Sequence, residues 1–152
     1  MPLSIRLATA ADTEPVLDLI EQLFEPPGPN PPYYTRQRGR DAVAHCLANP
    51  HAGILLAEDD RRAVGLASVF VEVLSIREGW RCVLEELVVD KSQRSRGVGA
   101  LLLEAAQAWA REHGCTHLRL ESGLGRTDAH RFYLAQGMDQ VSYSFNRRWD
   151  SD

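Results

Sequence analysis

A short stretch at residues 92–103, SQRSRGVGALLL, places two arginines and two glycines directly before an apolar run. Gly97 and Gly99 allow the backbone to approach a ligand closely, and a helix that begins here leaves its first N–H groups unpaired. Arg94 and Arg96 add positive charge at the same point. This pattern is suited to binding a pyrophosphate. A glycine pair that only packs a strand against a helix is the plainer interpretation.

A dinucleotide-binding turn is a rival interpretation of the same glycines. They follow an expected strand, and Glu121 stands about 20 residues later, where such folds place a ribose ligand. Leu102, however, occupies the position of the third glycine. The turn also lies in the middle of the chain, whereas the dinucleotide motif usually opens the first βαβ unit. We therefore rank this interpretation behind a simple pyrophosphate turn.

Hydrophobic periodicity and turn residues predict the elements that must position this turn. The expected strands are residues 4–8, a β-hairpin at 53–74 that turns at 59–62, residues 80–89, residues 117–121, and a last strand pair at about 138–149. The expected helices are residues 12–24, where Asp12 could act as the N-cap, about 38–47, 97–113 with Gly114 as the stop, and about 127–136. A proline-rich loop is expected at residues 25–34. The order predicts one mixed α/β domain, with its first strands antiparallel and its later ones linked by helices.

The composition limits the possible classes of protein. The chain has 152 residues, 44% hydrophobic and 25% charged, which suits one globular domain with a real core. Its net charge of -4 argues against a nucleic-acid partner that is bound through bulk positive charge. Three scattered cysteines without C-x-x-C spacing indicate a reduced, cytoplasmic setting. There is no signal-peptide-like apolar segment at the amino terminus and no apolar run of membrane-spanning length, so we expect no membrane partner.

A metal site is not expected. His113 and His117 are four residues apart, but Gly114 should end the helix between them and spoil a ligand pair on one helix face.

Two motifs in the expected order resemble those of the GNAT superfamily of N-acetyltransferases. Leu87-Val88-Val89 and the turn at 94–99 are similar to that family's strand and its (Arg/Gln)-x-x-Gly-x-(Gly/Ala) turn, and AHRFYLAQGM at 129–138 looks like its A-x-x-F-Y-x-x-x-G-F/Y helix. The order of elements fits the family over residues 3–149. The resemblance implies a single domain with a central mixed, mostly antiparallel sheet flanked by about four helices. ELVV at 86–89 and DAHRFYL at 128–134 look especially like aminoalkylphosphonate and other small-amine acetyltransferases.

The resemblance implies acetyl-CoA as the co-substrate and no metal. The turn would bind its pyrophosphate, and the strand backbone at Leu87 and Val89 would bind its pantetheine arm. Separation of this strand from the next one, residues 117–121, would open the transfer site. The residues expected at acetyl-CoA are Leu87, Val88, Val89, Arg94, Ser95, Arg96, Gly97, Val98, Gly99, Ala100 and His130, although His130 could equally be solvated.

The reaction that the resemblance implies is direct attack of an amine on the thioester. It needs a neutral amine, a polarised carbonyl and a proton for the departing thiolate. Tyr133 matches the family's helix tyrosine and is the expected proton donor. Otherwise Phe132 and Tyr133 are adjacent aromatic residues, one in the core and one at its edge.

The base departs from the family pattern, because several relatives carry a glutamate where this chain has Val83. Strand alternation puts Val83, Glu85 and Leu87 on one face, which makes Glu85 the better substitute. A bulge in the strand would bring in Glu86 instead, so Glu86 is the second candidate. Either glutamate could also be an ordinary partner of Arg81 or another basic residue.

The acceptor is expected to bind near residues 24–40, the segment that commonly shapes the acceptor pocket in this family. Its aromatic residues, with Arg36, Arg38 and Arg40, could recognise an amine that has an apolar or acidic part, but arginines on loops are usually just solvated. Arg126 stands where many members have asparagine, and could contact a CoA phosphate, an anionic group of the substrate, or only water.

The composition predicts a cytoplasmic protein, and the resemblance implies a homodimeric enzyme that moves an acetyl group from acetyl-CoA directly to a primary amine of a small molecule, such as an aminoalkylphosphonate. Two alternatives stay open. The apolar Val83 favours a module that binds acyl-CoA for regulation or sensing without turnover. A protein N-acetyltransferase is the other, and it would need an open acceptor groove.

Overall fold

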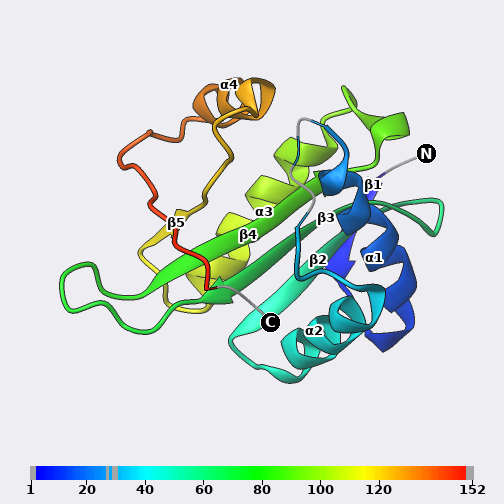
Figure 1. Ribbon diagram of the computed structural model, residues 1–152, viewed down its shortest axis with the longest axis horizontal. Helices are drawn as coiled ribbons and strands as arrows, with labels where there is room; N and C mark the ends of the chain where they lie inside the picture. Colours follow the sequence, from blue (N-terminus) through cyan, green and yellow to red (C-terminus); the bar gives the residue numbers. More distant parts are fainter. Residues whose placement is uncertain (1–2, 27, 29–30, 150–152) are drawn as a thin grey trace. The chain divides into compact units, whose positions relative to one another are not determined.

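The computed structural model describes residues 3–26, 28 and 31–149 (Figure 1). Pro27, Pro29 and Asn30 of the expected proline-rich loop lie outside the described residues. The chain divides into two compact units, Met1–Leu120 and Glu121–Asp152, which are described separately below.

The first unit is built on a five-stranded sheet with the strand order β1-β2-β3-β4-β5. Its strands are β1 (Leu3–Leu7), β2 (Ala52–Asp59), β3 (Arg62–Val71), β4 (Arg81–Val89) and β5 (His117–Arg119). The first four strands pair antiparallel, and β5 pairs parallel to β4. The prediction of a mixed, mostly antiparallel sheet is therefore confirmed. The β2–β3 hairpin turns where expected, with positive φ at Asp60 and Arg61, a conformation that matches the twist of the flanking strands.

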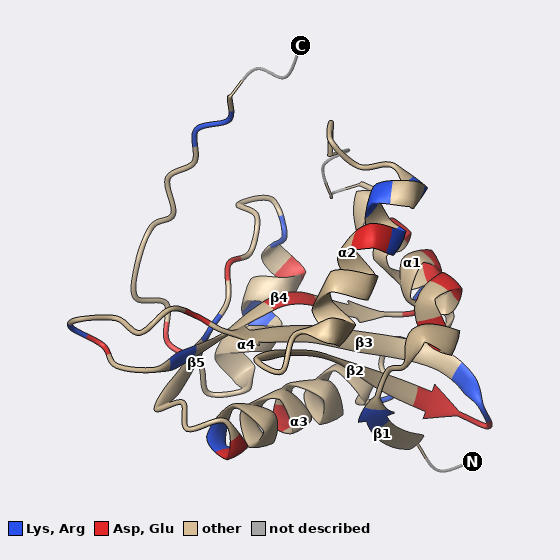
Figure 2. Ribbon diagram, turned by 90° about the horizontal axis from the view of Figure 1, so that it is seen from below, with Lys and Arg blue, Asp and Glu red and all other residues tan. Residues whose placement is uncertain are grey.

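Helices cover both faces of this sheet. The bounds are α1 (Thr13–Glu21), α2 (Arg36–Ala48) and α3 (Val98–Glu112) in the first unit, and α4 (Thr127–Ala135) in the second. Figure 2 shows α1 and α2 on one face of the sheet and α3 on the other. Leu17 of α1 and Val43 of α2 pack on Leu66 and Val88 of the sheet, while Leu102 of α3 is fully buried on the opposite side. Burial of these apolar faces is what holds the layers together.

Gly65 lets α3 approach the sheet closely. A Cβ atom at this position would stand 2.9 Å from the carbonyl oxygen of Val88, 3.0 Å from Leu102 Cδ1 and 3.1 Å from Val98 Cγ1. Because Val98 is the first residue of α3, the start of the helix lies directly against the sheet. Gly114, at φ +78, follows the end of α3 as predicted.

Two local predictions differ from the structure. Asp12 is the N-cap residue of α1, but its side chain makes no capping hydrogen bond to that helix; its carboxylate accepts hydrogen bonds from the Thr9 N–H and from Arg6, and so closes the preceding 3-10 turn. The last strand pair expected at residues 138–149 is not formed, since this described segment contains no strand. Its alternating apolar residues suit a strand, but a strand also needs a ladder partner, and Val141 and Phe145 are exposed. None of the described helices is long and apolar enough to cross a bilayer.

Candidate active site

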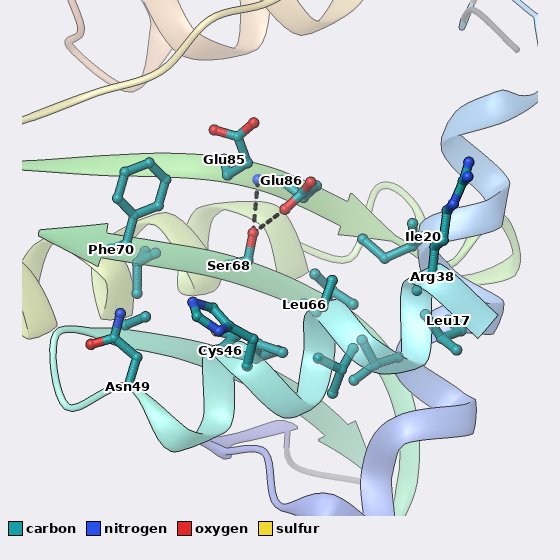
Figure 3. Close-up of a pocket in the computed structure, with 18 of the residues that line it drawn as sticks. Leu17, Ile20, Arg38, Cys46, Asn49, Leu66, Ser68, Phe70, Glu85 and Glu86 are labelled. Carbon is teal, nitrogen blue, oxygen red and sulfur yellow. Dashed lines mark hydrogen bonds between the residues drawn. The ribbon is translucent and has the colours of Figure 1, made fainter. Parts of the chain in front are cut away.

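A cavity of about 620 Å³ lies over the α1/α2 face of the sheet, within the first unit (Figure 3). Its walls are chiefly apolar and include Leu17, Ile20, Leu66 and Phe70. Its size is in the range usual for small-molecule sites. The strand β4 adds two carboxylates to this apolar surface, and that combination marks the cavity as a candidate binding site.

The two carboxylates reach the cavity because β4 bulges. Ser68 of β3 pairs with Glu86, but the next residue, Val69, pairs with Leu84, so that Glu85 is an extra residue in the ladder. Both Glu85 and Glu86 line the cavity. The premise on which Glu85 was preferred, an unbroken alternation along the strand, is therefore wrong. In Figure 3 the Glu86 side chain turns toward Ser68 and that of Glu85 turns away from it.

Glu86 is held by Ser68 through two hydrogen bonds. The Ser68 hydroxyl donates to Oε2 of Glu86 and accepts from the Glu86 N–H at 3.0 Å. Burial raises the pKa of the Glu86 carboxyl, the Ser68 hydrogen bond acts in the opposite direction, and the charge of Glu85 raises it again. A partly buried carboxyl with a raised pKa beside a cavity is a candidate for a group that accepts a proton from a bound ligand.

The glycine turn leads directly into the uncapped start of α3. Gly97 is the N-cap of α3 at φ +79, and no side chain caps the helix. The first helical hydrogen bond runs from the N–H of Leu101 to the carbonyl of Gly97 at 3.1 Å. The N–H groups of Val98, Gly99 and Ala100 precede this bond, so they have no carbonyl partner within the helix.

The basic side chains of the turn differ in their contacts. Arg96 binds Asp59 at 2.8 Å and also contacts Gln93, whereas the exposed Arg94 forms no hydrogen bond or ion pair within the described part of the chain. Ser95 has a positive φ of 70°, which shapes the turn between the two arginines. Arg94 is thus the side chain of this turn that is available to a ligand.

The strand that leads to the turn has one unpaired edge. The β4–β5 ladder covers only Arg81–Val83, opposite His117–Arg119. Beyond it, Leu87, Val88 and Val89 pair with β3 alone among the described strands. This agrees with the expected separation of the two strands. The strand β5 ends at Arg119, two residues before the expected end at residue 121. Backbone groups on this side of β4 are thus left for another partner.

The second unit holds Tyr133 and His130 on α4. The His130 ring hydrogen-bonds the carbonyl oxygen of Gly123 through Nε2 at 2.9 Å, so that nitrogen is engaged within its own unit. Tyr133 packs edge-on against Phe132, and burial raises the pKa of its phenol. Arg126 directly precedes the helix. The roles expected for Tyr133 and His130 stay predictions.

Sequence reasoning did not single out Ser68 or assign a role to Arg38, and both line the cavity. A signal for Ser68 was present, since it is a polar residue in the middle of the apolar run GLASVFV at 65–71. In the part of the chain that is described, no three His, Cys, Asp or Glu side chains gather in a metal-binding arrangement.

Comparisons with known proteins agree with this geometry. The sequence model of the acetyltransferase (GNAT) family matches residues 14–138. The aminoalkylphosphonate N-acetyltransferase of Salmonella typhimurium is 33% identical over 143 residues, which cover 94% of this chain and 89% of that protein. An aminoglycoside N(6')-acetyltransferase type 1 of Klebsiella aerogenes is 31% identical over 98 residues, which cover 63% of this chain and 64% of that protein.

A solved aminoglycoside N-acetyltransferase in complex with CoA shares the fold. It superposes with a TM-score of 0.85 at 21% identity, over 99% of this chain and 96% of that one. With its matched family model, its two-motif pattern and its bulged, acid-bearing strand, the chain belongs to the acetyltransferase (GNAT) family and is an N-acetyltransferase.

Proposed function

We propose that this protein transfers an acetyl group from acetyl-CoA directly to the primary amine of a small molecule that binds in the cavity over the α1/α2 face. The observation that carries the proposal is the bulge that brings Glu85 and Glu86 together into an apolar cavity. Two adjacent carboxylates attract an ammonium group, and the cavity is of a size for a small acceptor. Two relatives whose names give a small-amine acceptor, an aminoalkylphosphonate and an aminoglycoside, support this class of substrate.

The residues around the turn fit acetyl-CoA. The uncapped N–H groups of Val98, Gly99 and Ala100, with Arg94 beside them, suit a pyrophosphate. Gly97 leaves open space, because a Cβ atom there would meet nothing within 4 Å. The unpaired edge of β4 at Leu87 and Val89 suits the amide groups of the pantetheine arm. Acetyl-CoA would supply the activated thioester.

In this proposal, side chains of the protein accept a proton from the amine and donate one to the leaving thiolate. Glu86 accepts a proton from the bound ammonium, directly or through a water, and so delivers the neutral amine that can attack. Glu85 holds the ammonium electrostatically before that transfer. As the amine nitrogen bonds to the acetyl carbon and the carbon–sulfur bond breaks, Tyr133 gives its phenolic proton to the sulfur. The second proton of the amine leaves to water.

The remaining parts of the proposal concern the whole protein. We propose one acetyltransferase domain over residues 3–149, acting in the cytoplasm as a homodimer. The dimer is supported by the exposed apolar side chains of Val141, Tyr143 and Phe145 near the carboxyl end, which a second chain could cover.

The test is release of free thiol from acetyl-CoA by the purified protein with a panel of amines: aminoalkylphosphonates, amino acids, polyamines and aminoglycosides. Turnover with one class of amine is the expected result. Tight binding of acetyl-CoA without turnover of any amine would favour the sensing module instead. Failure to bind acetyl-CoA would overturn the assignment of the turn.

A further inference from the structure

Three arginines open α2, and the structure divides them into two groups. Arg36 and Arg40 face the carboxylates of α1: Arg36 binds Asp18 and Glu21 at 2.8 Å each, and Arg40 binds Glu14 at 2.8 Å. These two cations are neutralised within the protein.

Arg38 lies on the other side of the same helix turn. Residues two positions apart on an α-helix are separated by about 200°, so Arg38 points away from the α1 carboxylates and lines the cavity. One of its guanidinium nitrogens donates to the carbonyl oxygen of Tyr33 at 2.8 Å. The backbone N–H of Arg38 donates to Thr35 Oγ1 at 3.1 Å. It pairs with no carboxylate among the described residues. Since a guanidinium carries five N–H donors, most of them remain available to a ligand.

The cavity therefore carries charges of both signs. In Figure 3, Arg38 and Phe70 lie at opposite ends of the cavity, with Glu85 and Glu86 on β4 between them. Apolar side chains of Ile20 and Leu66 line the wall near Arg38 and Glu86. A ligand that satisfies this surface has an ammonium for the glutamates, a short apolar linker, and an anion for the guanidinium.

We propose that the acceptor is a small amine that carries one anionic group, a phosphonate, sulfonate or carboxylate, and that Arg38 binds this group and sets the preference for it. The inference rests on the function proposed above. A polyamine or an aminoglycoside would bring a further ammonium toward Arg38, and like charges in one cavity repel. Planar guanidinium groups bind tetrahedral and planar oxyanions through paired hydrogen bonds, which a lysine cannot match.

The experiment compares matched acceptors. Initial rates of thiol release are measured with 2-aminoethylphosphonate, 2-aminoethanesulfonate and 3-aminopropanoate, with propylamine, which has the amine but no anionic group, and with the polyamine spermidine. For the native protein we expect kcat/KM to be about 10- to 100-fold higher for at least one of the anionic amines than for propylamine. This is the size of effect expected when a ligand lacks the anion that would hydrogen-bond a charged side chain. The order among the three anions identifies the headgroup.

Variants then assign the preference to one side chain. Arg38→Gln should reduce the ratio of kcat/KM for the preferred anionic amine to kcat/KM for propylamine to less than about threefold, and Arg38→Lys should give an intermediate ratio. Arg40→Gln, which removes a neighbouring cation that is already paired, is the matched control and should leave the ratio as in the native protein.

The two proposals fail in different ways. Turnover of propylamine or spermidine at least as efficient as that of every anionic amine would overturn the role of Arg38 while leaving the acetyltransferase function intact. An anion preference that survives Arg38→Gln would overturn it as well. No turnover of any amine by a protein that binds acetyl-CoA would overturn the proposed function, and this inference with it.

Discussion

Ser68 and Glu86 lie opposite each other on β3 and β4, and each donates a hydrogen bond to the other. The serine hydroxyl thus holds both the backbone and the carboxylate of one residue. The ladder shifts register directly beside this pair, between Ser68 and Val69. It gives the glutamate a fixed direction within the cavity.

Replacing the hydroxyl tests that arrangement. In Ser68→Ala the carboxylate loses the hydrogen bond that lowers its pKa, so the pKa of Glu86 rises further. A base works only when deprotonated, and activity falls as the pH drops through its pKa. We therefore expect the acid limb of the pH profile of kcat/KM to move to higher pH, and the rate at neutral pH to fall about tenfold. Ser68→Thr keeps a hydroxyl and should restore the native profile; an unmoved acid limb in Ser68→Ala would exclude Glu86 as the titrating group.

The two neighbouring glutamates should differ in their contributions. Glu86→Gln removes the proton acceptor, and we expect kcat to fall by about 10²- to 10⁴-fold. Glu85→Gln removes only a charge that attracts the ammonium, so its main effect should be a higher KM for the amine, with kcat within about tenfold of native. Steady-state kinetics with a single amine at saturating acetyl-CoA distinguish the two. A larger loss of kcat in Glu85→Gln would exchange the roles.

Arg94 should matter only for a co-substrate that has a pyrophosphate. Arg94→Gln is expected to weaken binding of acetyl-CoA about fivefold, the size of a partly screened ionic contact. Acetylpantetheine has no pyrophosphate, so its KM should change less than about twofold. Arg111→Gln, in the last turn of α3, provides a control at the same net charge. Equal effects of Arg94→Gln on both co-substrates would show that the turn does not bind the phosphates.

Tyr133 is expected to act on the leaving group. Tyr133→Phe should lower kcat by about 10²-fold or more while leaving the dissociation constant of acetyl-CoA nearly unchanged, because only proton donation is lost. Rapid-quench measurement of acetyl transfer, together with calorimetric titration of acetyl-CoA, checks both statements. The exposed Tyr143 offers a matched Tyr→Phe control. A native kcat in Tyr133→Phe would assign the proton to water.

The close approach of α3 to the sheet makes a prediction about stability. In Gly65→Ala the new methyl group meets a backbone carbonyl and two buried side chains, which cannot all move away. We expect the free energy of unfolding to fall by about 1–3 kcal/mol, and Tm by roughly 2–10 °C. Gly125→Ala is the control, because its added Cβ would meet open space. Equal melting temperatures for the two variants would argue against a tight contact at Gly65.

Most of the sheet and helices could be predicted because their signals are local. The alternation on either side of Asp60 and Arg61 indicates a hairpin, and Gly97 and Gly114 mark the two ends of α3. The prediction of a final strand pair was wrong because its signal was not sufficient locally. Alternation at residues 138–149 is a property of one segment, whereas a strand needs a second segment with which it can pair.

The site was less predictable than the fold. The start of α3 after Gly97 could be predicted, since the exposed N–H groups of a helix start follow from local chain direction alone; the role of Arg94 stays a prediction. The bulge at Glu85 depends on how β3 aligns with β4, and no residue within β4 specifies it. The hydrogen bond between Ser68 and Glu86 could therefore not be predicted from the sequence. Nor could the lack of a carboxylate partner for Arg38 among the described residues, because the α1 carboxylates pair with Arg36 and Arg40 across two helices.

The short β4–β5 ladder has a consequence for how such a protein can diverge. A co-substrate bound along the open edge of β4 would be recognised by peptide groups, and every residue except proline offers the same N–H and C=O there. The acceptor cavity is instead defined chiefly by side chains, which come from α1, α2, β3 and β4. Random substitution would therefore change the preferred amine long before it abolished use of the acetyl donor, so new acceptor specificities can arise on this scaffold while catalysis continues.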